Sequence, residues 1–294
     1  MKDEIKVGLF FISPAIILVS FIYFYPLLKS LYISFHRWIL PLVAKKGPTF
    51  VGLDNYLRLV TSYNFQHSLL VTFYYVGLSV ALSLSLGLGM ALIVNESFKG
   101  RGILRGLFLI PFMMSPVASA VMWKWLLDYS AGAINSIFIQ LGLDLIPWLT
   151  DPLLALNSAV IVTAWYWTPW VMVIMLGGLQ SIPEELYKAA KVDGANAWQR
   201  FWYVTLPCLR PFIGVAVLFE LAVQMRLPDV IYVLTAGGPG GFTKVLAYLT
   251  YEQSFKFMSF GVGSAIGYFI MMISVAAIVV LYFLLKPGML KYVR

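Results

Sequence analysis

Residues 181–210, SIPEELYKAAKVDGANAWQRFWYVTLPCLR, form a polar stretch between two strongly apolar segments, residues 156–179 and 209–234. Each flanking segment is long and apolar enough to cross a bilayer, which takes about 20 residues of helix. A membrane protein that keeps a long amphipathic loop between two spans typically uses it to contact something in water. The partner of this loop is therefore the main question that the sequence poses.

The composition is that of a membrane protein. Of the 294 residues, 61% are hydrophobic and only 12% are charged, whereas soluble domains carry about 25% charged residues. Six continuously apolar runs predict an all-α polytopic membrane protein with six transmembrane helices and exclude a closed β-barrel. We expect the first run to be a retained span, because it is too long for the apolar region of a signal peptide. The runs cover residues 7–28, 69–94, 103–126, 156–179, 209–234 and 260–285.

Basic residues predict the orientation. With six spans, twelve Lys and Arg residues lie on the side of both termini and the central loop, and seven lie on the other side. Because cytoplasmic loops carry the excess of Lys and Arg, both termini and residues 181–210 are expected in the cytoplasm. The net charge of +8 is then mostly a topology signal, and no nucleic-acid motif accompanies it. The lone Cys208 excludes a disulfide framework, and isolated histidines predict no metal site.

The first part of the central loop has the pattern of a short helix. Ser181 and Glu184 have capping-box spacing, and Pro183 lies in the first turn, where its missing N–H does no harm. We therefore predict a helix over about residues 183–191.

A turn and a second helix are expected next. Asp193-Gly194 predicts a turn, because glycine tolerates positive φ. A helix over residues 195–203 would end before Pro207. The plain alternative for the whole stretch is a solvated connection without a partner.

The central loop resembles the EAA loop of binding-protein-dependent ABC transporter permeases. That pattern reads Glu-Ala-Ala, three residues, Gly, nine residues, Ile, one residue, Leu-Pro. Two positions depart from it: Lys188 stands where the family has Glu, and Val204 replaces Ile. Since the first change reverses a charge, Glu184 and Glu185 are the candidates to compensate. The full spacing is matched by Ala189, Ala190, Gly194, Val204, Leu206 and Pro207.

The resemblance extends over nearly the whole chain. Residues 50–56, FVGLDNY, resemble a motif after the first span of sugar-uptake permeases. Residues 234–240, LTAGGPG, followed by residues 248–255, resemble the loop before their last span. These segments indicate the carbohydrate group, and within it the larger membrane subunit of maltose transporters. The resemblance implies a type I ABC importer permease: one transmembrane permease domain over residues 1–294, with residues 181–210 as its cytoplasmic EAA coupling loop.

The same resemblance implies partners and a division of labour. The chain would pair with a second homologous permease subunit, two ATP-binding cassette subunits and an extracytoplasmic sugar-binding protein in a bacterial or archaeal cytoplasmic membrane. ATP and Mg would bind to the cassette subunits. This chain is not expected to bind them, because its sequence lacks the G-x-x-x-x-G-K-[ST] phosphate loop. The chain is thus expected to be a transport subunit and not an enzyme. The implied coupling residues are Glu184, Glu185, Lys188, Ala189, Ala190, Asp193 and Gly194.

Two helix faces are candidates for a substrate site. At about 100° per residue, four residues of the fourth span share one face, and four of the fifth span share another. Aromatic planes suit the C–H faces of sugars, and carboxylate and amide groups suit their hydroxyls. An ionisable residue within a span is a functional candidate by default. The predicted lining is Thr163, Tyr166, Trp167, Trp170, Glu220, Val223, Gln224 and Leu227.

The resemblance places these eight residues at positions that line the sugar site of the maltose permease, but with large departures. A Gly position is Trp167, two Asn positions are Thr163 and Leu227, and a Ser position is Glu220. A differently shaped site is therefore expected, and the sugar stays open among oligosaccharides, disaccharides and polyols. The alternative is structural: Trp165, Trp167 and Trp170 would form an interfacial aromatic belt, and Glu220 would pair with a neighbouring helix.

Remaining charges near the span ends are expected to be structural. Arg226 and Asp229 flank Pro228, which should interrupt the helix, and they are expected to pair with each other or with the partner permease, with contact to the substrate as the open alternative. Lys124 and Asp128 are spaced for an i,i+4 pair.

Two other functions compete. An ion- or proton-coupled secondary transporter would account for Glu220 and Arg226 but not for the EAA spacing. An intramembrane enzyme would need a paired His/Asp or Ser/Lys constellation within the spans, and the sequence shows none.

Overall fold

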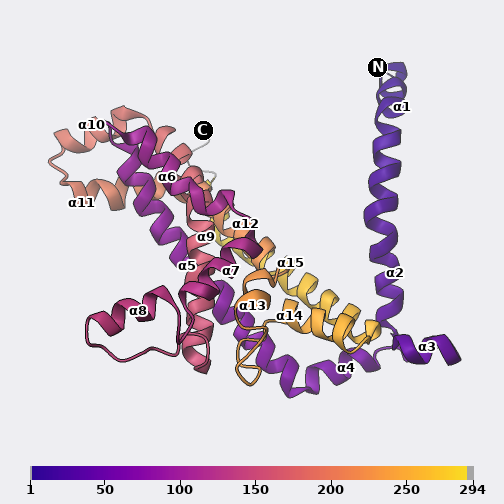
Figure 1. The fold of residues 1–294 in the computed structure, drawn as a ribbon. Coiled ribbons are helices and arrows are strands. Elements are labelled where there is room, and N and C mark those ends of the chain that lie inside the picture. The colour runs from indigo at the N-terminus through magenta and orange to yellow at the C-terminus, as the bar shows by residue number, and fades with distance from the viewer. Residues whose placement is uncertain (1, 290–294) are drawn as a thin grey trace. The chain divides into compact units, whose positions relative to one another are not determined.

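The structure, a computed structural model, describes the backbone of residues 2–289 and the side chains of residues 11–44 and 47–283 (Figure 1). The described part of the chain is mostly helical, as the sequence predicts. The described strands are β1 (His36–Arg37) and β2 (Thr49–Phe50), which pair antiparallel. Five helical segments are long and apolar enough to cross a bilayer: Phe11–Ser34, Tyr63–Asn95, Pro152–Gln180, Ala197–Gln224 and Phe260–Phe283.

The third apolar run is broken, so the expectation of one continuous helix there is wrong. Its residues form α6 (Arg101–Met113) and α7 (Pro116–Leu126), which are bent by 95°. Ser115 between them is extended, with φ −64° and ψ 139°, because a proline disfavours the helical conformation in the residue before it. Counting the bent pair as one span gives up to six spans.

The fifth run also ends earlier than its apolar composition indicates. The spanning helix α12 (Leu206–Gln224) stops before Pro228, and the separate short helix α13 (Asp229–Leu234) follows. The predicted interruption at Pro228 is thus confirmed, and residues 225–234 do not continue the span.

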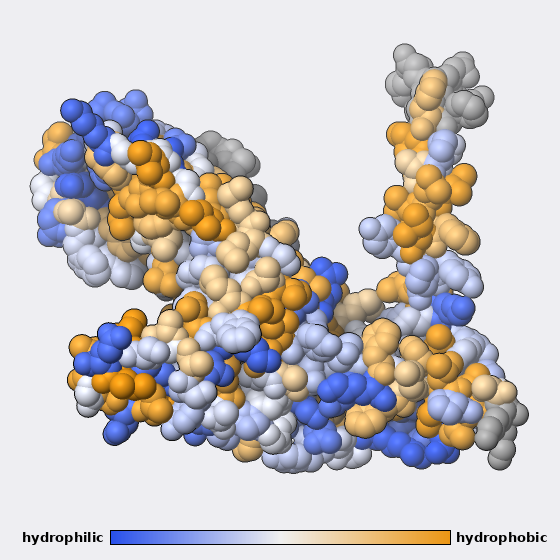
Figure 2. Space-filling view, viewed as in Figure 1, coloured by the Kyte–Doolittle hydropathy of each residue, from blue (hydrophilic) through white to orange (hydrophobic). Residues whose placement is uncertain are grey.

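The chain divides into two compact units. The first comprises residues 1–66 and 249–269. Its N-terminal segment is helical throughout the described residues, and side chains such as Phe11, Phe21 and Tyr23 are about 70% exposed. Figure 2 shows hydrophobic residues along the outside of this segment. Such a surface requires lipid or another protein to cover it. The helices of this unit include α1 (Lys2–Val19), the π-helical turn η1 (Ser20–Phe24), α2 (Tyr25–Ser34), α3 (Leu40–Lys46) and α4 (Asp54–Thr61).

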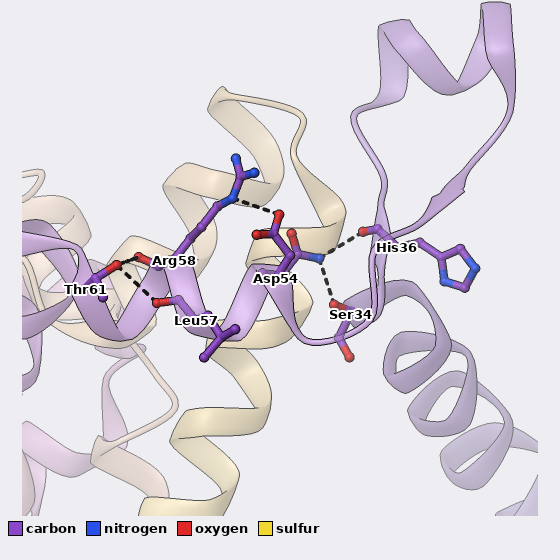
Figure 3. A network of polar contacts seen from close by, with 7 residues as sticks. Ser34, His36, Asp54, Leu57, Arg58 and Thr61 are labelled. Atoms are coloured by element: carbon purple, nitrogen blue, oxygen red, sulfur yellow. Dashed lines mark hydrogen bonds and ion pairs between the residues drawn. The ribbon is translucent and has the colours of Figure 1, made fainter.

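The FVGLDNY motif at residues 50–56 has a structural role in this unit. The buried Asn55 amide donates to the carbonyl oxygens of Ser34, at 2.8 Å, and His36, at 3.0 Å (Figure 3). The Tyr56 hydroxyl lies 2.6 Å from Ser34 Oγ. Gly52 supplies the positive φ of +55° that starts the turn into α4. The motif therefore fastens the end of α2 to the β1–β2 pair and α4.

The second unit comprises residues 67–248 and 270–294. Its core forms where α5 (Tyr63–Asn95), α9 (Pro152–Gln180) and α12 meet, around fully buried side chains such as Val171, Met175 and Leu209. Gly87 permits the close approach of α5 and α9, because a Cβ there would lie 2.7 Å from Val171 Cβ. Small residues at helix crossings serve this purpose in membranes generally.

The two ends of α9 carry different structures. Figure 1 shows α10 (Glu184–Val192) and α11 (Ala197–Arg200) at one end and α8 (Ala133–Gln140) at the other. The second unit also holds α14 (Leu246–Tyr251) in part. The π-helical turn η3 (Glu252–Lys256) belongs to the first unit, and α15 (Phe260–Met289) runs through both.

Asp128 caps a turn rather than pairing with Lys124. Its Oδ1 accepts hydrogen bonds from the backbone N–H groups of Ser130 and Ala131 and from the Ser130 hydroxyl. The Ala131 bond first, and then the two Ser130 bonds, hold the pKa of Asp128 below its usual value. Within the described residues no ion pair joins Asp128 to Lys124, so the predicted i,i+4 pair is wrong.

Candidate functional site

The central loop folds into two short helices around a glycine. Between α10 and α11, Gly194 adopts a φ of +79° with no neighbouring atom within 4 Å of a Cβ built on it. The predicted turn at Asp193-Gly194 is confirmed. Hydrophilic residues gather over this end of the second unit (Figure 2). The loop thus presents an exposed glycine turn to its surroundings.

The caps of these helices differ from the prediction. Ser181 Oγ donates to the Gly178 carbonyl and closes α9, and α10 begins after Pro183 without a side-chain cap. The capping box of the loop instead joins Asn196 and Gln199, with each side chain on the other's backbone N–H at 2.9 Å and 2.8 Å. The sequence pattern Asn-x-x-Gln could have identified it.

The second loop helix does not stop before Pro207, contrary to the prediction. The chain stays helical from Ala197 to Gln224, through α11, the π-helical turn η2 (Phe201–Thr205) and α12. Pro207 lies in the first turn of α12, where the wider η2 turn before it changes the hydrogen-bonding register. A continuous helical path therefore connects the loop to the middle of the molecule.

The seven predicted coupling residues lie on one small structure. All are exposed except Ala190, which is half-buried. The Tyr187 hydroxyl lies 3.0 Å from Thr205 Oγ1, which ties α10 to η2. Ile182 packs into the core beside Met175 and Leu209. α10 is thus tied to the spanning helices through Tyr187 and through Ile182, which lies just before its first residue.

A small cavity lies within the second unit, between helices α5, α7, α9, α12 and α13. Its volume is about 30 Å³, room for one or two waters and not for a sugar. Six of the eight predicted substrate residues line it. The lining is Tyr75, Pro116, Thr163, Tyr166, Trp167, Val223, Gln224, Leu227, Asp229 and Val230.

Polar groups converge on this cavity from the four helices α5, α9, α12 and α13. The Tyr75 hydroxyl lies 2.6 Å from Thr163 Oγ1, and the Tyr166 ring meets the Trp167 ring edge-on with centroids 5.6 Å apart. Tyr75 was missed from the sequence because it lies on α5, outside the two helix faces that suggested the site. The helical spacing of Thr163, Tyr166 and Trp167 did identify their shared environment.

Trp170 and Glu220 do not line the cavity, but each contacts a residue that does: Trp170 contacts Trp167, and Glu220 contacts Gln224. The Trp170 indole stacks on the Phe219 ring, with centroids 4.4 Å apart and planes 21° apart. Glu220 is fully buried, and its Oε2 lies 2.7 Å from Ser83 Oγ and accepts a hydrogen bond from Gln224 Nε2 at 3.2 Å. Glu220 therefore contacts both the neighbouring helix α5 and a cavity-lining amide.

Trp165 faces elsewhere and lines a larger apolar cavity of about 400 Å³ between α5, α6, α7 and α9. Its ring meets that of Trp123 edge-on at 5.5 Å. Trp165 therefore lies apart from Trp167 and Trp170, whose rings meet edge-on with centroids 6.2 Å apart and both contact Phe219.

Arg226 and Asp229 do not pair with each other in the described part of the chain, so that alternative is wrong. Arg226 Nε donates to the Ala222 carbonyl at 2.8 Å. Asp229 lines the cavity, and partial burial raises the pKa of its carboxyl. Sequence reasoning favoured structural pairing for Asp229 over substrate contact, and the structure places Asp229 in the lining.

Comparison with known proteins agrees with this architecture. Residues 83–291 match the model of the family described as "binding-protein-dependent transport system inner membrane component". The trehalose/maltose transport system permease protein MalF of Thermococcus litoralis is 38% identical over 263 residues, 90% of this chain and 88% of that one. The sulfoquinovosyl glycerol transport system permease protein SmoG of Agrobacterium fabrum is 32% identical over 87% of this chain and 82% of that one.

A solved structure shares the fold. A bacterial ABC transporter involved in the import of the acidic polysaccharide alginate has a chain that superposes with a TM-score of 0.82 at 23% identity, covering 97% of this chain and 98% of that one. The family match covers well over half of the present sequence, begins within α5, and includes the loop, the cavity-lining helices α7, α9, α12 and α13, and the last span. The chain belongs to the family of inner membrane components of binding-protein-dependent transport systems.

Proposed function

We propose that this chain is the transmembrane subunit of an ATP-driven ABC importer and forms half of the translocation pathway for a sugar delivered by an extracytoplasmic binding protein. The observation that carries the proposal is the loop built around Gly194, at the end of a bundle whose relatives include a trehalose/maltose permease similar over 90% of the chain. ATP hydrolysis, with its ATP and Mg, belongs to two separate cassette subunits.

The loop geometry supports a mechanical coupling role. Force applied to α10 reaches η2 through the Tyr187–Thr205 contact. From η2 it passes along one continuous helix to Gln224 in the cavity lining. A helix transmits axial displacement over its whole length because each residue is hydrogen-bonded to the next turn. The proposed contact surface is Glu184, Glu185, Lys188, Ala189, Ala190, Asp193 and Gly194.

The cavity chemistry supports a hydroxyl-rich substrate. Aromatic rings, an amide and a carboxylate lie together on Trp167, Gln224 and Asp229, and such groups suit the C–H faces and hydroxyls of sugars. We assign the substrate site to Thr163, Tyr166, Trp167, Val223, Gln224 and Leu227 in the lining, with Trp170 and Glu220 behind it. A second homologous permease subunit and a wider conformation would complete a site that holds only about 30 Å³ here.

The distribution of basic residues supports a cytoplasmic location for both termini and for the loop. The loop then faces the compartment in which ATP is available, and the opposite ends of the spans face the binding protein.

Secondary transport coupled to ions or protons is the competing proposal. The fully buried Glu220 favours it, because carboxyl groups within spans mark proton and ion pathways in many transporters. Uptake that persists in vanadate and stops when the proton gradient collapses would support this alternative.

Co-purification tests the proposal. The tagged chain, expressed together with its neighbouring genes and purified in mild detergent, should bring down a cassette ATPase subunit that is identified by mass spectrometry. A loop variant, Gly194→Trp, should retain the complex and lose the link between ATP hydrolysis and uptake. A wild-type chain that never co-purifies with an ATPase subunit would overturn the proposal.

A further inference from the structure

The buried polar groups between α5 and α12 form a chain that reaches the cavity. Ser83 Oγ lies 2.7 Å from Glu220 Oε2, which lies 3.2 Å from Gln224 Nε2. Gln224 Oε1 in turn lies 2.6 Å from Ser79 Oγ. Ser79, Ser83 and Glu220 are fully buried, and Gln224 is nearly so and lines the cavity. One end of this chain therefore orients an amide of the proposed substrate site.

The serines have more acceptors than hydrogens. Ser83 Oγ lies within hydrogen-bonding distance of the Val80 carbonyl, at 3.0 Å, as well as of Glu220 Oε2. Ser79 Oγ lies 2.7 Å from the Tyr75 carbonyl and 2.6 Å from Gln224 Oε1. A hydroxyl carries one hydrogen and can accept two. Ser83 can therefore donate to its own helix carbonyl only if Glu220 brings a hydrogen to it, whereas Ser79 donates to one of its two acceptors at a time.

The environment of Glu220 contains too few donors for a carboxylate. Its Oε1 atom is buried and has no hydrogen-bond partner. Glu220 also forms no ion pair with the described Lys, Arg or His side chains. An ionised carboxyl in the interior of a span needs such partners, because burial without them is very unfavourable.

A hydrogen on Glu220 Oε2 resolves the count at Ser83. The carboxylic acid donates to Ser83 Oγ, whose own hydrogen goes to the Val80 carbonyl, and 2.7 Å is an ordinary O–H···O distance. Glu220 Oε2 still accepts from the Gln224 amide. Ser79 holds the other end of that amide, so both of its terminal atoms are fixed.

We propose that Glu220 is a neutral carboxylic acid that acts as a positioning residue for transport, fixing the Gln224 amide toward the substrate through its contacts with Ser83 and Gln224. This inference rests on the proposed function for its substrate, and its protonation state can be measured without transport. Glu220 then determines specificity through Gln224 without lining the cavity itself.

Infrared spectroscopy of the purified complex tests the protonation state. Wild-type protein should show the carbonyl band of a buried carboxylic acid, which Glu220→Gln removes and Ser83→Ala shifts. Ser85→Ala is the matched control and should leave the band unchanged, because this exposed serine on the same helix bonds only to its own turn. A band that survives Glu220→Gln, or a spectrum with carboxylate bands alone, would overturn the inference.

Uptake kinetics test the positioning role. The probe is the sugar, from a panel of trehalose, maltose, other disaccharides and polyols, that most raises the unfolding temperature of the cognate binding protein. In proteoliposomes with ATP, Glu220→Leu should raise KM about tenfold with little change in maximal rate, the effect of one lost hydrogen bond. Ser79→Ala should act in the same direction, and Glu220→Gln should restore a KM close to the wild-type value.

Different results would contradict the positioning role of Glu220 and the proposed transport function of the chain. A Glu220→Gln variant as impaired as Glu220→Leu would show that a negative charge is required and would overturn the positioning role. Wild-type protein that imports no member of the panel in an ATP-dependent manner would contradict the proposed function, and the infrared result would still decide the state of Glu220.

Discussion

Lys188 Nζ lies 3.2 Å from Glu184 Oε2, one turn earlier on α10. The family pattern has Glu where this chain has Lys188. The reversed charge of Lys188 is paired within its own helix, with Glu184. Both side chains are more than 70% exposed, and such i,i+4 pairs contribute only about 0.3–0.5 kcal/mol. The pair therefore adjusts the charge that the loop offers to a partner and contributes little to folding.

Lys188→Ala should change the ATPase activity of the complex while leaving the free energy of unfolding nearly unchanged. We expect the free energy of unfolding to change by less than about 0.5 kcal/mol, because the lost pair is exposed. ATPase activity stimulated by the binding protein should fall if the partner contacts Lys188. Thermal unfolding and ATPase assays on the same preparation measure both quantities. Destabilisation by more than about 1.5 kcal/mol would show that the pair stabilises the fold, contrary to its exposure.

Gly194 tests the turn of the coupling loop. Gly194→Ala places a side chain at φ +79° in open space, so we expect only the cost of the left-handed conformation, about 1–2 kcal/mol. Gly106→Ala is the matched control, since it also has open space but lies in a helix without positive φ. Differential scanning calorimetry compares them; equal effects of the two substitutions would rule out a conformational requirement at Gly194.

Gly87→Ala tests the close packing of α5 against α9. The new methyl group would lie 2.7 Å from Val171 Cβ and 3.0 Å from the Met172 backbone nitrogen, so we expect a loss of about 1–3 kcal/mol from overpacking. Gly89→Ala, on the same helix with nothing within 4 Å, should be neutral or slightly stabilising. The unfolding midpoints of the two variants in detergent should differ clearly, and matching midpoints would show that the helices do not approach this closely.

Asp229 and Asp128 should respond to pH in opposite directions. Burial raises the pKa of Asp229, so its contribution to stability is present below its unfolded pKa and is lost as pH rises through the folded value. Hydrogen bonds lower the pKa of Asp128, so its contribution is present above its unfolded pKa and is lost as pH falls.

Replacing each aspartate by asparagine tests these opposite pKa shifts. At neutral pH, Asp229→Asn should keep or raise the unfolding temperature, whereas Asp128→Asn should lower it, and the Asp128→Asn difference should shrink in acid. Thermal unfolding across a pH series measures both effects. A destabilised Asp229→Asn variant at neutral pH would mean that its carboxylate has an ionic partner, which the structure does not contain among the described residues.

The sequence predicts the spans and the loop well because both depend on local pattern. Runs of apolar residues locate the membrane helices, and the EAA spacing locates Gly194 at a turn. The bend at Ser115 was hidden because residues 103–126 are apolar on both sides of it, and only Pro116 marks the break. Helicity through Pro207 depends on the π-helical turn η2, which composition does not encode.

The site is predictable only in part, because its members come from several helices. Helical spacing placed Tyr166 and Trp167 on one face of the fourth span, and Val223 and Gln224 on one face of the fifth. It could not show that Ser79 and Ser83 on α5 meet Gln224 and Glu220, which depends on how two helices distant in sequence pack. For the same reason Tyr75 and Asp229 emerged only from the structure.

Sugar uptake by the reconstituted complex tests the central claim most directly. The chain is purified with its co-expressed partners, placed in proteoliposomes with ATP on the loop side, and supplied with the binding protein and its preferred sugar on the other side. The proposed function predicts uptake that vanadate abolishes and that collapse of the proton gradient leaves unchanged. Uptake that resists vanadate and stops when the gradient collapses would contradict it and identify a secondary transporter.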